Sequence, residues 1–170
     1  MSIQTFMRQS PRVIFGLILI GCVALLAFAY YAQYVWYMDP CPLCILQRIA
    51  FMVMGFGALL GLIHGSRGAA RWLYVLVIWA GGVWGLITAG RHIWLQNLPP
   101  DQVPDCGPGF AFIQEQDGLA AAIRMAFEGT GDCSLISWQF LGLSMPGWTL
   151  VWYAVLMLLS LFALRRFTKD

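Results

Sequence analysis

The sequence predicts an all-α membrane protein, a four-transmembrane-helix bundle with two loops on the outer side of the membrane. Of the 170 residues, 60% are hydrophobic and only 11% are charged, a composition outside the range of soluble globular domains. Four apolar stretches of about 18 to 21 residues are each long enough to cross a hydrocarbon core of about 30 Å. Four spans in so short a chain predict a single membrane domain covering residues 1–170.

We expect the spans at residues 13–31, 43–63, 72–90 and 147–164. The first follows Arg8 and Arg12, as the core of a secretory signal would. Its apolar run is longer than a normal signal core, which favours an uncut helix. Glycines recur in the second and third spans, as suits close helix contacts in lipid.

The two outer loops should cover residues 32–42 and 91–146. Within the second loop, residues 117–127 have a helical pattern in which Leu119 and Ile123 share an apolar face. This pattern predicts a short interfacial helix that lies on the membrane surface.

Basic residues mark one side of the membrane. They lie before the first span, between the second and third, and after the fourth: Arg8, Arg12, Arg67, Arg71, Arg165, Arg166 and Lys169. By the positive-inside rule these segments, and both termini with them, face the cytoplasm. In a bacterium the chain would lie in the inner membrane with its loops in the periplasm, where disulfides persist. No nucleic-acid partner is expected.

A Cys-x-x-Cys pair, Cys41 and Cys44, stands where the first outer loop meets the second span; we call it the helix-end pair. Pro40 and Pro42 stiffen this turn, so Cys44 should lie in the first helical turn. The helix N-terminus and Arg48, one turn along, favour a thiolate at Cys44. Cys44 is therefore interpreted as the electron-donating sulfur and Cys41 as the exposed partner that exchanges with other thiols.

Two simpler interpretations of the helix-end pair are a structural disulfide and half of a zinc site. Zinc needs about four Cys or His ligands in close array, and the sequence has no second closely spaced pair. No metal is therefore expected, and redox chemistry is favoured. Cys22, in the middle of the first span, is interpreted as a small packing residue.

Two further cysteines, Cys106 and Cys133, lie in the second outer loop; we call them the loop pair. The Pro- and Gly-rich segment 98–109 should be extended and present Cys106 to a partner. A bond that only closed the loop would add about 3 to 4 kcal/mol by the chain-entropy estimate. An exposed loop disulfide also suits exchange, and the presence of the helix-end pair favours that interpretation. All four outer cysteines are candidate catalytic residues.

Arg48 and His92 are candidate functional residues beside the helix-end pair. His92 follows Arg91 at the outer end of the third span, at the depth of Arg48. Ionisable groups at membrane depth are candidates for function, although a boundary residue such as Arg91 can extend to water. His64 belongs to the opposite, cytoplasmic side and is interpreted as a surface residue, which argues against a haem held by both histidines.

Taken together, these motifs resemble the DsbB family of disulfide bond formation proteins of the bacterial inner membrane, and the likeness covers nearly the whole chain. It rests on Cys41-x-x-Cys44 with Arg48, on Arg91-His92, on Cys106 with Gly131-Asp132-Cys133, and on segment 138–146. The resemblance implies a quinone, ubiquinone or menaquinone, bound near Arg48 and His92. It also implies a periplasmic thioredoxin-like thiol oxidase, DsbA, as partner. The partner would be reoxidised through the loop pair and then the helix-end pair, and the electrons would pass to the membrane quinone.

Two alternatives use the same residues. A quinone-linked oxidoreductase resembling vitamin K epoxide reductase also joins a helix-end pair to loop cysteines, but the loop order and segment 140–146 favour the DsbB-like interpretation. A non-enzymatic four-span scaffold with structural disulfides would need neither Arg48 nor a quinone.

Overall fold

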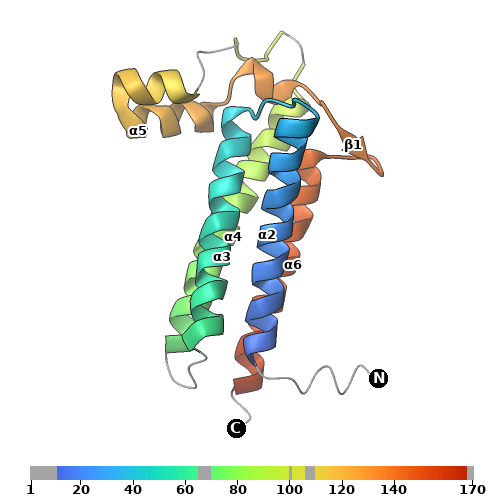
Figure 1. Cartoon of the computed structure of the whole chain (residues 1–170). Coiled ribbons are helices and arrows are strands. Elements are labelled where there is room, and N and C mark those ends of the chain that lie inside the picture. The colour runs from blue at the N-terminus through green and yellow to red at the C-terminus, as the bar shows by residue number, and fades with distance from the viewer. Residues whose placement is uncertain (1–10, 65–69, 100, 106–109, 168–170) are drawn as a thin grey trace.

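Four long helices stand side by side in the computed structural model, which describes residues 11–64, 70–99, 101–105 and 110–167 (Figure 1). They are α2 (Pro11–Val35), α3 (Pro42–His64), α4 (Ala70–Gln96) and α6 (Met145–Phe167). All four are long and apolar enough to cross a membrane. The chain is an all-α, multi-pass membrane protein, as its sequence predicts.

Each predicted span lies within one of these helices, and the helix that holds the third span extends beyond it. Helix α4 continues past Gly90 to Gln96, because residues 91–96 contain neither Gly nor Pro. Arg91 and His92 are therefore helical residues and not loop residues. His92 shares a face with Gln96, one turn further on.

Glycines let the helices approach closely, as their recurrence predicts. A Cβ atom at Gly81 of α4 would lie 2.9 Å from the carbonyl oxygen of Ala50 in α3. Gly85, on the same helix, faces the ring of Tyr153 in α6. Cys22 is buried in this core with 1% of its surface exposed, which confirms its packing role.

The smaller elements gather at one end of the bundle, opposite the start of α2 and the end of α6 (Figure 1). They are α5 (Phe110–Glu128), the 3₁₀ helix η1 (Gly131–Ser134), and the strands β1 (Gln139–Phe140) and β2 (Leu143–Ser144). Helix α5 is bent at Gly118, where φ is 85°. The helix expected at residues 117–127 is therefore only the second half of α5, and the first half was not predicted.

A hairpin that the sequence did not reveal precedes α6. Strands β1 and β2 pair antiparallel, and Leu141 and Gly142 form the turn with φ values of 50° and 79°. Two positive φ values make a tight turn whose twist matches that of the paired strands. Trp148 of α6 donates a hydrogen bond from Nε1 to the carbonyl oxygen of Phe140 at 3.0 Å, which fixes the hairpin to the bundle.

Candidate functional site

The helix-end pair stands at the N-terminus of α3. The helix begins at Pro42, so Cys44 lies in its first turn, as predicted. The two sulfur atoms are 3.1 Å apart, and the backbone N–H of Cys44 donates to the Sγ of Cys41 at 3.4 Å. Both sulfur atoms belong to one reactive centre.

Cys41 is not the exposed member of this pair. Only 9% of its surface is exposed, and it lies in an apolar cluster with Leu43, Leu95 and Cys133. The prediction of an exposed Cys41 is wrong because η1 folds back from the second loop and covers it. Cys44 is half-buried and lines the cavity described below.

Cys133 of η1 meets the helix-end pair directly. It is fully buried and lies in the same apolar cluster as Cys41. The neighbouring Cys41 side chain and burial raise the pKa of the Cys133 thiol, against the opposing effect of the backbone N–H groups of Thr130 and Leu43. Cys133 therefore keeps its proton while it rests beside Cys41 in the reduced centre.

Cys106 lies outside the described residues. Asp105, which precedes it, accepts a backbone hydrogen bond from the N–H of Gly131 at 3.2 Å. Gly131 begins the 3₁₀ helix that carries Cys133. The chain that leads to Cys106 is therefore tied to the element that carries the other loop cysteine.

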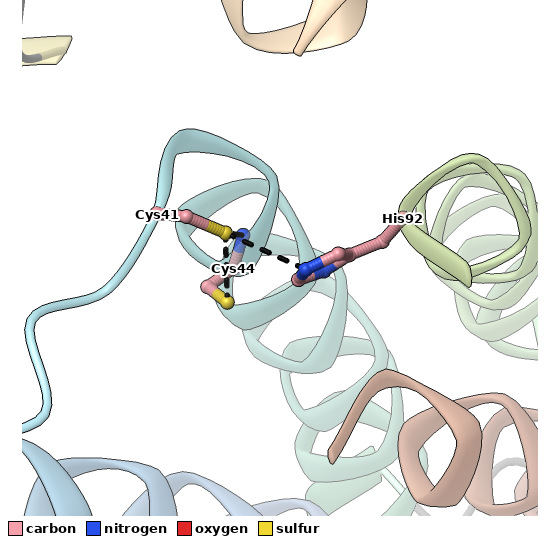
Figure 2. A group of neighbouring side chains, drawn as sticks. All are labelled: Cys41, Cys44 and His92. Atoms are coloured by element: carbon pink, nitrogen blue, oxygen red, sulfur yellow. Dashed lines mark hydrogen bonds between the residues drawn. The ribbon is translucent and has the colours of Figure 1, made fainter. Parts of the chain in front are cut away.

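His92 reaches from α4 to the helix-end pair (Figure 2). Its Nε2 lies 3.8 Å from Cys41 Sγ, and its Nδ1 lies 3.2 Å from Gln47 Nε2. The Oε1 of Gln47 accepts a hydrogen bond from Thr149 Oγ1 at 2.8 Å. The single hydroxyl proton of Thr149 is shared between Gln47 Oε1 and the carbonyl oxygen of Pro146, 2.9 Å away. With the amide oxygen of Gln47 on this side, its amide nitrogen faces Nδ1 and donates to it. The proton of a neutral His92 then resides on Nε2, which faces the sulfur.

Three potential metal-ligating atoms also meet here. Cys41 Sγ, Cys44 Sγ and a ring nitrogen of His92 lie within 4.8 Å of one another and could hold a metal ion. Disulfide chemistry needs the same two sulfur atoms to be free. The expectation that the site holds no metal stays a prediction.

Arg48 crosses from α3 to α2. Its guanidinium donates to Gln33 Oε1 at 2.5 Å and to the carbonyl oxygen of Ala29 at 3.3 Å. It also lies 4.9 Å from the ring centroid of Tyr30. These contacts from one helix hold a positive charge at the edge of the cavity.

Arg91 points elsewhere. Its guanidinium donates to the carbonyl oxygens of Phe127 and Glu128, at 3.4 and 3.0 Å, at the end of α5. It also stacks over the ring of Trp94, 4.2 Å from the centroid. Arg91 therefore anchors α5, and His92 is the member of this dipeptide that lines the cavity.

A cavity of about 380 Å³ lies beside these groups, with walls from α2, α3, α4 and α6. Arg48, His92 and Gln96 supply polar lining. Aromatic rings form much of the rest: Phe28, Phe51, Trp138, Phe140, Trp148 and Trp152. Aromatic walls suit a planar ring, and the polar side chains can donate to its carbonyl oxygens. The lining fits a quinone.

Three residues that contact or line this site were not predicted from the sequence: Gln33, Gln96 and Thr149. Gln96 could have been found, because it follows His92 by one helical turn once the helix is extended. Gln33 and Thr149 come from other helices, and no local pattern indicates that they meet Arg48 and Gln47.

Comparisons with known proteins agree on one family. The family model for "Disulfide bond formation protein DsbB" matches residues 11–163. A "Disulfide bond formation protein B" from Marinobacter nauticus is 46% identical over 93% of this chain and 94% of the relative. Proteins of the same name from Acinetobacter baumannii and Xanthomonas euvesicatoria pv. vesicatoria are 40% and 47% identical. These alignments cover 95% and 92% of this chain, and 95% and 91% of the relatives.

Proposed function

Because the chain belongs to the DsbB family of thiol oxidoreductases, whose members reoxidise DsbA by way of quinone, we propose that electrons travel through it in a fixed order. They pass from a periplasmic DsbA-like partner to the loop pair, then to the helix-end pair, and then to ubiquinone or menaquinone. The observation that carries this proposal is that Cys133 and Cys41 are buried together in one apolar cluster. It joins the two pairs at one point.

The exchange steps follow from this contact. A thiolate of the reduced partner attacks Cys106, breaks the loop disulfide and releases Cys133. Cys133 loses its proton and attacks Cys41, so that the bond between Cys41 and Cys44 breaks and Cys44 leaves as a thiolate. The partner's second thiol then releases Cys106 and completes the partner's disulfide.

The centre is then reset. Cys106 attacks Cys133, re-forms the loop disulfide and frees Cys41. Cys41 and Cys44 re-form their own disulfide, and the quinone takes up the two electrons and two protons as an oxidant and leaves as quinol. The net reaction converts one partner dithiol and one quinone into one disulfide and one quinol.

Arg48 and His92 stabilise charge during these steps. The guanidinium of Arg48, held at the cavity by α2, favours the Cys44 thiolate and the negative charge that develops on a quinone oxygen. The Nε2–H of His92 faces Cys41, so it stabilises that sulfur when it is freed as a thiolate.

We also propose that the chain forms a single domain in the bacterial inner membrane, with both termini in the cytoplasm. The basic residues at the helix ends support this orientation. So does the grouping of α5, η1 and the hairpin at the opposite end (Figure 1). The catalytic end would then face the periplasm, where the partner resides.

A stopped-flow experiment tests the function. The purified protein is mixed with reduced DsbA-like partner and ubiquinone or menaquinone, and quinone absorbance and partner thiols are followed together. We expect quinone loss to equal partner oxidation, and Cys106→Ala to abolish turnover. If the thiols stay reduced although partner and quinone are competent in an independent control, the scaffold interpretation replaces this one.

A further inference from the structure

The β1–β2 hairpin carries large apolar side chains that remain uncovered by the part of the chain that the structure describes. Leu141 is 78% exposed, Phe140 54% and Leu143 40%. Leu135 and Ile136, just before the hairpin, are 67% and 49% exposed. Contiguous apolar surface of this kind marks a contact site and not a water-facing loop.

The hairpin lies beside the membrane-spanning helices and does not project above them. Figure 1 shows it next to the outer ends of α2 and α6, with its turn lower than the top of the bundle. The ring of Trp138 meets that of Phe28 in α2, 5.9 Å between centroids, and Trp148 of α6 holds the backbone of Phe140. Tryptophans gathered at a helix end are typical of the membrane interface.

The chemistry of this segment also suits lipid. No charged residue occurs between Asp132 and Arg165. The pairing of Gln139 with Ser144 and of Phe140 with Leu143 satisfies part of the hairpin's own backbone hydrogen-bonding potential, which lowers the cost of bringing its backbone into an apolar medium.

The hairpin is at the same time a wall of the cavity. Trp138 and Phe140 line it together with Leu25 of α2 and Trp152 of α6. One side of the hairpin therefore faces the cavity, while Leu141 at the turn is absent from the lining and faces outward.

We propose that the β1–β2 hairpin inserts its apolar turn into the outer leaflet of the bilayer and forms the lipid-side wall of the cavity. A long-chain quinone would pass this wall to reach Cys44 directly from the membrane. The membrane contact is independent of the proposed function, whereas the route of the quinone rests on it.

Photocrosslinking in lipid nanodiscs tests the membrane contact. Leu141 is replaced by photoreactive benzoylphenylalanine, and adducts are identified by mass spectrometry with and without the DsbA-like partner. Leu158, 57% exposed on α6, is the lipid-facing control, and the exposed loop residue Gln102 is the water-facing control. We expect lipid adducts at Leu141 in a yield close to that at Leu158. Adducts with the partner alone, or a yield no higher than at Gln102, would overturn the proposal.

Kinetics test the route of the quinone. For Leu141→Asp we expect the KM for a long-chain quinone to rise about fivefold, since an apolar contact with lipid is lost. The KM for a short-chain, water-soluble quinone and the kcat should match those of the Leu141→Met control. An unchanged long-chain KM would rule out this route. If the unaltered protein reduces no quinone, the proposed function fails and the crosslinks alone decide the membrane contact.

Discussion

At the scale of single residues, the hydrogen bond that His92 can offer to Cys41 depends on which ring nitrogen of His92 carries the proton. Thr149 orients the amide of Gln47, Gln47 occupies Nδ1 of His92, and the Nε2–H of His92 then faces Cys41. Gln47 and Thr149 line the cavity, but neither is hydrogen-bonded to a sulfur atom. They act as positioning residues for His92.

We predict that Gln47→Leu lowers kcat about tenfold, the effect of losing roughly one buried hydrogen bond that holds His92. The ¹⁵N NMR signals of His92 should show a mixture of tautomers in place of the Nε2–H form. Thr149→Ser keeps the hydroxyl and serves as the matched control, with little change expected. If Gln47→Leu slows turnover while the tautomer of His92 is unchanged, the positioning role is wrong.

The protonation of Cys133 leads to a pH prediction. Its pKa is raised by the neighbouring Cys41 side chain and by burial, so the unreactive neutral thiol persists to higher pH than in an ordinary cysteine. In the fully reduced protein, alkylation of Cys133 should still accelerate between about pH 10 and 11, where a thiol of pKa about 8.5 has levelled off.

Unfolding the protein in detergent supplies the control for this titration. The alkylation rate of Cys133 should then level off near the ordinary thiol pKa of about 8.5. A plateau at that pH in the folded protein would contradict the raised pKa, and with it the contact between Cys133 and Cys41.

Most site residues could be predicted from the sequence because their signals are local. Cys41, Cys44 and Arg48 lie within two turns of one helix start, and His92 is ionisable at membrane depth. The burial of Cys41 could not be predicted, because it depends on η1, which arrives from far along the chain. Long-range packing leaves no local pattern.

At the scale of elements, Gly129 forms the turn that ends α5 and leads to η1. Its φ of 81° ends α5, and its N–H donates to the carbonyl oxygen of Met125 at 3.0 Å. A Cβ atom there would collide with the side chain of Leu95 in α4. The turn that delivers Cys133 therefore needs both the positive φ and the missing side chain.

We predict that Gly129→Ala destabilises the outer end by at least about 1 to 2 kcal/mol, the cost of a left-handed alanine, with the clash added to it. Transfer from the loop pair to the helix-end pair should slow as Cys133 moves from Cys41. Gly142→Ala is the control, because it has a similar φ of 79° but open space around the Cβ position. Equal effects of the two variants on transfer would show that the contact with Leu95 is unimportant.

Elements differed in how well the sequence revealed them. The four spans were predictable because length and hydropathy suffice. The hairpin was not, since its turn is Leu-Gly and lacks the Asn-Gly or Asp-Gly signal of such turns. The first half of α5 was missed because Gly118 interrupts the helical pattern at the point where the two halves meet.

At the scale of the whole molecule, the orientation in the membrane can be tested with a reporter. Alkaline phosphatase folds only where its disulfides form, outside the cytoplasm. We expect a fusion inserted after Gln102 to be active and a fusion after Asp170 to be inactive. An active fusion after Asp170 together with an inactive fusion after Gln102 would contradict the proposed topology.

The proposed electron route requires Cys44 as the electron donor to quinone. A single-turnover experiment on Cys44→Ser tests this role most directly. The variant, with its loop pair oxidised, is mixed with reduced partner and quinone. We predict that one equivalent of partner is oxidised at the expense of the loop disulfide, with no loss of quinone absorbance. Stoichiometric quinone reduction by Cys44→Ser would show that electrons leave the protein by another route and would contradict the mechanism.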